Sequence, residues 1–297
     1  MPRGRSVPTV PAPERACLVS VAVRGASGPL STDESLDELA HLASTAGARV
    51  VKRVSQVLQK PSRTYVGTGK LDELKETAKS DRIDVVIFDD ELRPSQQRAL
   101  EDALGVKVID RSGLILDVFA ARARTREGKL QTDLAQSEYL LPRLAGQWAH
   151  LERLGGGIGT RGPGESQIET DRRIVRSKIS RLKRELELVR QQRASQRRNR
   201  AQGETRIVDL VGYTNAGKSL LFNRLTDSAV IARDQLFSTL DPTTRRIFLP
   251  SGTPAVLTDT VGFIHKLPSI VVAAFRATLE ELREADLLLH VIDISNP

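Results

Sequence analysis

The sequence predicts an α/β protein in three parts: an N-terminal domain with a parallel sheet, an antiparallel helical hairpin, and a second α/β domain around a phosphate-binding loop. In the predicted N-terminal domain, 16–128, strand-like and helix-like segments alternate over residues 16–119, which is typical of parallel strands joined by helical crossovers. Residues 129–203 carry two apolar seams with helical spacing. Residues 204–297 contain a match to G-x-x-x-x-G-K-[ST] between a strand-like and a helix-like segment.

The N-terminal domain is expected to begin at residue 16, after a proline-rich tail, 1–15, that we expect to be disordered. The predicted strands are Val19–Val23, Ala48–Val57, Val85–Phe88 and Val106–Ile109. The predicted helices are Ser35–Ala46, Lys70–Ser80, Pro94–Leu104 and Arg111–Phe119. Because these segments contain no phosphate loop and no cluster of catalytic residue types, we expect a structural or binding role for this domain.

The helical hairpin is predicted from two apolar seams that keep the same register on either side of a glycine-rich loop. The first seam consists of Leu130, Leu134, Ser137, Leu141, Leu144, Trp148 and Leu151. The second consists of Ile168, Val175, Ile179, Leu182, Leu186 and Val189, with Arg172 as the one break. Matching seams predict two helices that pack antiparallel, and Pro142 predicts a kink in the first.

Positive charge concentrates in the second helix of the hairpin. Residues 171–200 hold twelve Lys and Arg against three acidic residues, so the net charge of this segment is +9. Since the net charge of the whole chain is +8, the rest of the chain carries −1. A basic stripe on one element is typical of a nucleic-acid partner, although a solvated helix face has the same composition. The loop 155–164 has six glycines in ten positions, and its bare backbone suits close approach to RNA better than a flexible-linker role does. The predicted RNA contacts are Arg161, Gly162, Arg172, Arg173 and Arg176.

The phosphate loop, Gly212–Ser219, follows the apolar run Arg206–Val211 and precedes a helix-like segment. This order places backbone N–H groups and a helix N-terminus around a polyphosphate. The two glycines allow the turn, Lys218 neutralises the β- and γ-phosphates, and Ser219 offers its hydroxyl to Mg²⁺. The predicted nucleotide contacts of this segment are Gly212, Tyr213, Thr214, Asn215, Ala216, Gly217, Lys218, Ser219 and Leu220.

Two further motifs complete the predicted site. Ala255–Gly262 is a strand that runs into Asp-x-x-Gly, so Asp259 can hold the Mg²⁺ shell and the Gly262 N–H can sense a γ-phosphate. The polar loop Phe237–Arg245 can close over the ion through a threonine hydroxyl, as switch loops do. Thr239 is the preferred ligand, and Thr243 and Thr244 are the alternatives, so the predicted Mg²⁺ ligands are Ser219, Thr239 and Asp259. The remaining predicted nucleotide contacts are Phe237, Ser238, Leu240, Asp241, Thr260, Val261 and Gly262. Leu287–Asp293 is the next predicted strand.

Composition narrows the class of protein. No apolar run approaches the roughly eighteen residues of a membrane span, so we expect a cytoplasmic protein without one. Cys17 is the only cysteine, which argues against a disulfide framework and a thiolate metal site. The four histidines lack ligand spacing. We expect a monomer.

Together these motifs resemble the HflX family of ribosome-associated GTPases. The resemblance rests on Gly-Gly-x-Gly-x-Arg-Gly-Pro-Gly-Glu ending at Glu165, the phosphate loop, Phe-Ser-Thr-Leu-Asp-Pro-Thr-Thr-Arg from Phe237, Asp-Thr-Val-Gly-Phe-Ile from Asp259, and Ala-Phe-Arg-Ala-Thr-Leu-Glu-Glu ending at Glu281. It implies a protein that binds GTP and GDP, uses Mg²⁺ and hydrolyses GTP. It also implies association with the large ribosomal subunit and its rRNA, and splitting or rescue of stalled ribosomes.

Three features bear on how far the resemblance extends. Related GTPases select guanine with Asn-Lys-x-Asp on a later strand, and the sequence stops at Pro297 before one, so we expect an incomplete sheet with an exposed apolar edge. Phe263 occupies the position of the water-positioning glutamine of Ras, so the catalytic group is expected from the ribosome or elsewhere in the protein. Asn215 matches the asparagine of potassium-activated GTPases, which predicts a K⁺ ion there.

The sequence is compatible with two other functions. Without a guanine motif, a phosphate-loop ATPase that acts on RNA fits the same residues. A nucleotide-independent RNA-binding protein, in which the basic hairpin does the binding, fits them as well. Competition between ATP and GTP separates the first from a GTPase, and binding that depends steeply on salt but not on nucleotide favours the second.

Overall fold

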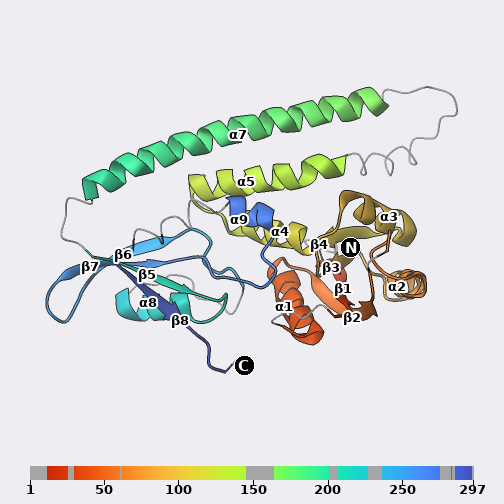
Figure 1. The fold of residues 1–297 in the computed structure, drawn as a ribbon, viewed down its shortest axis with the longest axis horizontal. Coiled ribbons are helices and arrows are strands. Elements are labelled where there is room, and N and C mark those ends of the chain that lie inside the picture. The colour runs from red at the N-terminus through yellow and green to blue at the C-terminus, as the bar shows by residue number, and fades with distance from the viewer. Residues whose placement is uncertain are drawn as a thin grey trace, which may run out of the picture.

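The computed structural model describes residues 12–25, 30–60, 62–144, 164–200, 206–226, 236–274, 282 and 285–295. Within the helix formed by residues 164–200, side chains are described only from 168 to 192. Most of the predicted N-terminal tail and of the glycine-rich loop, including Arg161 and Gly162, lies outside these residues. Two sheets lie at opposite ends of the molecule, and a pair of long helices runs above them (Figure 1). The structure confirms the predicted α/β class.

The N-terminal sheet has four parallel strands in the order β2-β1-β3-β4. Its strands are β1 (Arg15–Val23), β2 (Arg49–Leu58), β3 (Val85–Phe88) and β4 (Lys107–Asp110). Its helices are α1 (Thr32–Thr45), α2 (Thr68–Ser80), α3 (Pro94–Leu104) and α4 (Arg111–Arg122). Helices α1 and α4 contribute to one apolar cluster and α2 and α3 to another, so the two faces of the sheet are covered separately. The predicted alternation of strands and helices is confirmed, with ends shifted by a few residues.

Local sequence explains where several of these helices begin and end. Ser31 and Glu34 form a capping box at the start of α1. Pro94 opens α3, and Gly105, with φ of 70°, ends it. Asp110 caps α4 by accepting a hydrogen bond from the Gly113 N–H at 2.9 Å.

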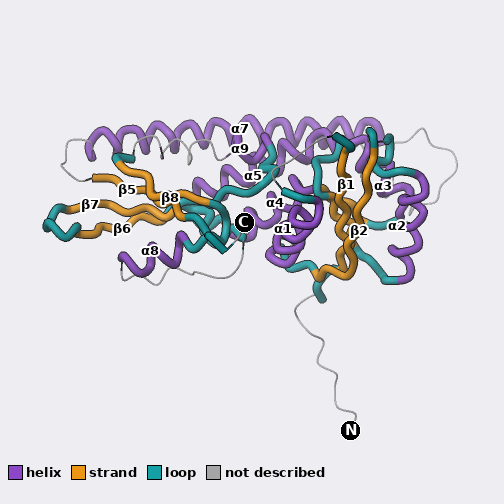
Figure 2. Tube along the Cα trace, turned by 60° about the horizontal axis from the view of Figure 1, so that its bottom comes forward, coloured by secondary structure: helices purple, strands orange, loops and turns teal. Residues whose placement is uncertain are grey.

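The helical hairpin consists of α5 (Arg126–Leu140), the 3₁₀ turn η1 (Leu141–Arg143) and α7 (Gly164–Arg200), and α7 runs back alongside α5 (Figures 1 and 2). The two predicted seams meet in one buried cluster that contains Leu134, Ile179, Leu182 and Leu186. The α-helical part of α5 ends at Leu140, and Pro142 lies in the 3₁₀ turn, because a proline removes one backbone hydrogen bond of the helix. The predicted pairing is therefore confirmed for the described part of the hairpin, whereas Trp148 and Leu151 of the first seam lie outside the described residues.

Arg143 connects the hairpin to the N-terminal domain through hydrogen bonds and an ion pair. Its guanidinium donates to Oδ2 of Asp110 at 3.0 Å and to the Leu92 carbonyl at 2.8 Å, and it lies 3.7 Å above the Tyr139 ring. The Tyr139 hydroxyl donates to Oδ1 of the same Asp110 at 2.8 Å. A buried carboxylate is thus shared between the end of β4 and the hairpin.

The C-terminal sheet has the order β6-β7-β5-β8. Its strands are β5 (Arg206–Gly212), β6 (Thr243–Phe248), β7 (Pro254–Asp259) and β8 (Leu287–Val291), and its helices are α8 (Lys218–Thr226) and α9 (Ser269–Ala274). Among these four strands, the β6–β7 pair is antiparallel and the β5–β7 and β5–β8 pairs are parallel. β8 lies at one edge, where Leu287 and Leu288 are 52% and 48% exposed. Among the residues that the structure describes, no helix could cross a bilayer.

Candidate functional site

The phosphate loop lies between β5 and α8, as its sequence predicts. Gly212 has a φ of 149°, and a Cβ there would collide with the backbone carbonyl of Val291 on the neighbouring strand. Gly217 has a φ of 91°. Both positions therefore favour glycine, because side chains rarely adopt this backbone conformation.

The three predicted Mg²⁺ ligands meet at the carboxyl end of β7. The Ser219 hydroxyl lies 2.6 Å from Oδ2 of Asp259 and 2.8 Å from Oγ1 of Thr239, and Thr239 Oγ1 donates to the same Asp259 oxygen at 2.8 Å. All three side chains are buried. A carboxylate and two hydroxyls form an all-oxygen donor set of the kind that Mg²⁺ prefers.

The electrostatics of this cluster also fit a cation. Oδ1 of Asp259 is buried and has no hydrogen-bond partner among the described residues. Burial raises the pKa of the Asp259 carboxyl, while the hydrogen bonds from Ser219 and Thr239 act in the opposite direction. A divalent ion would both satisfy the free oxygen and offset the cost of burying the charge.

The start of β6 separates the two alternative threonines from Thr239. Thr243 and Thr244 belong to this strand, and Oγ1 of Thr244 lies 3.4 Å from Oγ1 of Thr258 on β7. The predicted polar loop therefore ends at residue 242, and its last residues are strand. Of the three candidates, only Thr239 reaches Ser219 and Asp259.

Lys218 provides a positively charged side chain next to this cluster. Its Nζ donates to the carbonyls of Gly212 at 3.1 Å and Tyr213 at 2.6 Å, and its side chain is buried. Burial lowers the Lys218 pKa to about 8, although the Asp259 charge partly opposes this. An ammonium that lacks a full counter-charge in a buried place is well suited to an anionic phosphate.

A cavity of about 380 Å³ adjoins these side chains. Its lining residues are Thr214, Asn215, Gly217, Lys218, Ser219, Leu220, Phe237, Ser238, Thr239, Thr260 and Gly262. Of the other predicted contacts, Gly212, Ala216, Asp259 and Val261 belong to the adjoining loop and strand ends. Tyr213, Leu240 and Asp241 have their side chains elsewhere: Tyr213 bonds Glu38, Leu240 joins the N-terminal core, and Asp241 binds the start of α5.

The segment after Asp259 lies directly on the phosphate loop. The Thr214 N–H donates to the Phe263 carbonyl at 2.7 Å, and the Phe263 N–H donates to the Gly212 carbonyl at 3.0 Å. A Cβ at Gly262 would approach the Cα of Thr214 to 2.7 Å and Nζ of Lys218 to 2.8 Å. The contact therefore requires glycine at this position, while the Phe263 side chain is 41% exposed.

Three family models match consecutive parts of the chain: a GTP-binding GTPase N-terminal region over residues 33–120, a GTP-binding GTPase middle region over 122–200, and a 50S ribosome-binding GTPase over 207–297. The GTPase HflX of Flavobacterium psychrophilum is 49% identical over 284 residues, which cover 95% of this chain and 68% of that protein. The chain belongs to the HflX family of GTPases.

Other HflX relatives show the same similarity. GTPase HflX of Alkalihalophilus pseudofirmus is 55% identical over 89% of this chain, and that of Caldanaerobacter subterraneus is 52% identical over 96%. The chain spans 63% and 65% of the length of these two relatives. Among solved structures, the complex of SsGBP with GDP matches with a TM-score of 0.53 and 26% identity, over 94% of this chain and 72% of that one.

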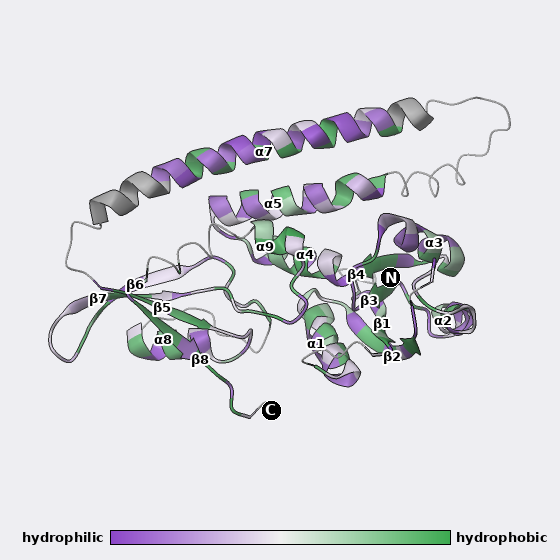
Figure 3. Cartoon of the chain, viewed as in Figure 1, coloured by the Kyte–Doolittle hydropathy of each residue, from purple (hydrophilic) through white to green (hydrophobic). Residues whose placement is uncertain are grey.

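The predicted RNA contacts are only partly within the described residues. Arg173 and Arg176 are exposed on α7, and Arg172 is half-buried. Hydrophilic residues dominate α7 (Figure 3). A groove of about 560 Å³ along this helix is lined by Arg173, Ile174, Ser177, Lys178, Arg181 and Arg184. The structure thus places several guanidinium groups around one exposed depression.

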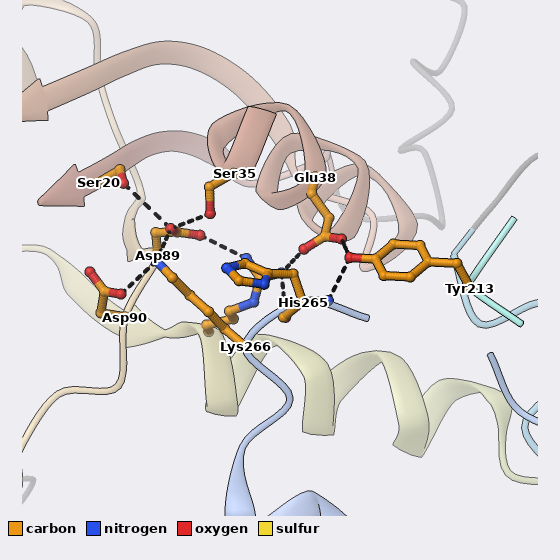
Figure 4. A network of polar contacts seen from close by, with 9 residues as sticks. Ser20, Ser35, Glu38, Asp89, Asp90, Tyr213, His265 and Lys266 are labelled. Carbon is orange, nitrogen blue, oxygen red and sulfur yellow. Dashed lines mark hydrogen bonds and ion pairs between the residues drawn. The ribbon is translucent and has the colours of Figure 1, made fainter. Parts of the chain in front are cut away.

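An interdomain network was not predicted from the sequence. The buried carboxylate of Asp89, just after β3, accepts hydrogen bonds from Ser35 at 2.7 Å and Lys266 at 2.7 Å (Figure 4). It also accepts one from Arg111 at 2.7 Å. Arg111 also donates to the His265 carbonyl at 2.9 Å and pairs with Glu38. No local pattern signals these contacts, because the partners are far apart in the sequence, and His265 and Lys266 come from the C-terminal domain.

Proposed function

We propose that this chain binds GTP and hydrolyses it with Mg²⁺. The observation that carries the proposal is the convergence of Ser219, Thr239 and Asp259 beside Lys218 and an open cavity. The phosphate-loop N–H groups and Lys218 bind the polyphosphate, and the three oxygens bind the ion. Bound Mg²⁺ would neutralise charge that develops on the phosphates during transfer. The GDP complex of the related SsGBP supports a guanine nucleotide.

Among the described residues, the site has no identified side chain that orients the attacking water. Phe263 stands where Ras has glutamine, and an apolar ring cannot hold a water molecule. We assign that role to the ribosome or to another part of the protein, so hydrolysis by the isolated chain is slow. A K⁺ ion at Asn215 would supply part of the missing charge. Equal hydrolysis rates in K⁺ and Na⁺ would remove the ion from this scheme.

The proposed partner is the large ribosomal subunit, in the cytoplasm, through its rRNA. The C-terminal domain matches the 50S ribosome-binding GTPase model, and α7 presents a basic groove. Phosphate oxygens of RNA would bind the guanidinium groups of Arg173, Arg176 and Arg184. Splitting or rescue of stalled ribosomes is the biological role that this pairing of nucleotide site and RNA surface favours.

A titration with a fluorescent GTP analogue tests the proposal, with unlabelled GTP, GDP and ATP as competitors. We expect GTP and GDP to compete and ATP to compete weakly. Ser219→Ala should weaken Mg²⁺-dependent binding, whereas Ser251→Ala, in an exposed turn beside Thr253, should leave it unchanged. Stronger competition by ATP would favour the ATPase alternative. Complete absence of binding, with RNA binding intact, would favour the nucleotide-independent alternative.

A further inference from the structure

The loop that carries Thr239 is attached to helix α5, outside the C-terminal sheet. Oδ2 of Asp241 accepts the backbone N–H groups of Arg124 at 2.7 Å and Thr125 at 2.8 Å, and Oδ1 accepts the Thr125 hydroxyl at 2.5 Å. Thr125 is itself the N-cap of α5, and its Oγ1 accepts the Gly128 N–H at 3.0 Å. A carboxylate near a helix N-terminus is favoured by the free N–H groups and the helix dipole. Asp241 therefore completes the start of α5 from another domain.

Apolar contacts attach the same loop to α4. The Phe237 ring is 2% exposed and packs edge-on against Phe119 of α4, with the ring centroids 4.7 Å apart. Leu236 and Leu240 are buried in the same cluster. Phe237 has a φ of 54°, a conformation that a bulky residue adopts only when its surroundings hold it there. The loop is therefore attached both to α5 of the hairpin and to α4 of the N-terminal domain, while the Thr239 hydroxyl points to Ser219 and Asp259.

Gly128 gives Asp241 the room that it needs. A Cβ at Gly128, built on the observed backbone, would overlap Oδ1 of Asp241 and lie 3.2 Å from its Cγ. Glycine is a poor residue for a helix, so its presence in the first turn of α5 is explained by this close approach. Gly69, in the first turn of α2, has nothing within 4 Å of the same built atom. The two glycines form a matched pair that differ in this contact.

We propose that Asp241 is a positioning residue for the Mg²⁺ site. By binding the N-terminus of α5, Asp241 holds Thr239 against Ser219 and Asp259. The inference rests on the proposed GTPase function. A loop that only nucleotide orders must lose its conformational freedom at each binding event. When Asp241 binds α5, the loop loses this conformational entropy during folding of the chain rather than during nucleotide binding. Thr239 is then in place before nucleotide binds.

The first test measures amide hydrogen exchange of residues 236–242 and 124–128 without nucleotide or Mg²⁺. Asp241→Ala and Gly128→Ala should both speed exchange by about tenfold or more, because the loop then opens locally. Gly69→Ala should not change it. Asp241→Asn, which keeps one acceptor oxygen, should give an intermediate rate. Exchange rates equal to those of the wild-type chain in all variants would overturn the proposal.

The second test measures GTP hydrolysis as a function of Mg²⁺ and GTP. Asp241→Ala and Gly128→Ala should raise the half-saturating Mg²⁺ concentration and lower kcat, each by about tenfold, because one ligand is misplaced. The KM for GTP should change little, since the phosphate loop is intact. A general loss of folding would instead affect all parameters and the thermal midpoint. Unchanged Mg²⁺ dependence with faster exchange would also overturn the positioning role.

A double variant separates the proposed cause from an unrelated effect of either substitution. If Gly128→Ala acts by displacing Asp241, it should have little further effect in the Asp241→Ala background, so the two effects are not additive. Additive effects would contradict the proposed contact. If the wild-type chain hydrolyses no GTP either alone or with large ribosomal subunits, the proposed function fails, and the exchange rates alone decide whether Asp241 holds the loop.

Discussion

Nζ of Lys266 lies 2.7 Å from Oδ2 of Asp89, so the segment that follows the Asp-x-x-Gly motif is paired with the carboxyl end of β3 in the N-terminal sheet (Figure 4). The same ammonium lies 2.6 Å from Oδ1 of Asp90. Asp89 is completely buried, whereas the Lys266 side chain is 33% exposed. A segment expected to sense the γ-phosphate is therefore joined to a second domain by a largely buried ion pair.

Lys266→Ala should lower the free energy of unfolding by about 1–3 kcal/mol, the usual range for a hydrogen bond to a buried charged group. Arg111 and Ser35 still bind Asp89 in the variant, which limits the loss. Urea unfolding followed by circular dichroism measures the change. Arg53→Ala is the control, because its pair with Asp37 is exposed on both sides and should contribute little. Equal losses in both variants would show that Lys266 has no special role.

Nucleotide binding should take up a proton at alkaline pH through Lys218. Its pKa in the folded chain is about 8, below the ordinary value of 10.5. Between these values the unfolded chain binds more protons, so this group makes the free protein more stable as pH rises. Bound phosphates restore the ammonium form. Calorimetry at about pH 8.5 in buffers of different ionisation enthalpy should detect uptake approaching one proton. Lys218→Met should abolish it, and uptake that persists in this variant would implicate another group.

Neighbouring substitutions at residues 262 and 263 should differ sharply. Gly262→Ala places a Cβ where Thr214 and Lys218 leave no room, so the segment must separate from the phosphate loop. GTP hydrolysis should fall by about tenfold or more, as expected when a reacting group is misplaced. Phe263→Ala should change kcat by less than about threefold, because its side chain offers no group to the attacking water. A large loss in Phe263→Ala alone would reveal a role for the ring.

Replacing arginines on α7 should weaken binding to purified large ribosomal subunits. We expect the triple variant Arg173→Glu, Arg176→Glu and Arg184→Glu to lower affinity and to reduce the slope of log affinity against log salt. Each lost phosphate contact should reduce that slope by about 0.7–0.9. Arg53→Glu, exposed on β2, is the charge-matched control for a single position. An unchanged salt slope would place the RNA contacts elsewhere on the chain.

Much of the fold follows from local patterns. The alternating segments of the N-terminal domain and the two apolar seams of the hairpin predict elements that the structure confirms. The phosphate loop and Ser219 are predictable because spacing along one strand–turn–helix unit places them together. Asp259 is predictable because Asp-x-x-Gly follows a second strand. Thr239 is the preferred ligand from sequence, but Thr243 and Thr244 stay alternatives, since a polar loop without a known end does not indicate which hydroxyl turns inward.

The contacts between domains could not be predicted in this way. Lys266 meets Asp89, and Asp241 meets Thr125, across separations of 177 and 116 residues. Polar and charged side chains so far apart in the sequence have many possible partners, and composition does not distinguish among them.

From its order of residues alone, the chain specifies an α/β protein with a phosphate loop, two helices that pair along apolar seams and a basic second helix. These properties depend on neighbours within a few turns or strands, where backbone geometry and hydrophobic spacing are decisive. Tertiary packing brings the Thr239 hydroxyl to Asp259, pairs the Asp241 side chain with the start of α5, and buries Asp89 beneath Lys266. Those outcomes depend on which surfaces the domains bury together, and burial is a property of the whole fold rather than of any segment.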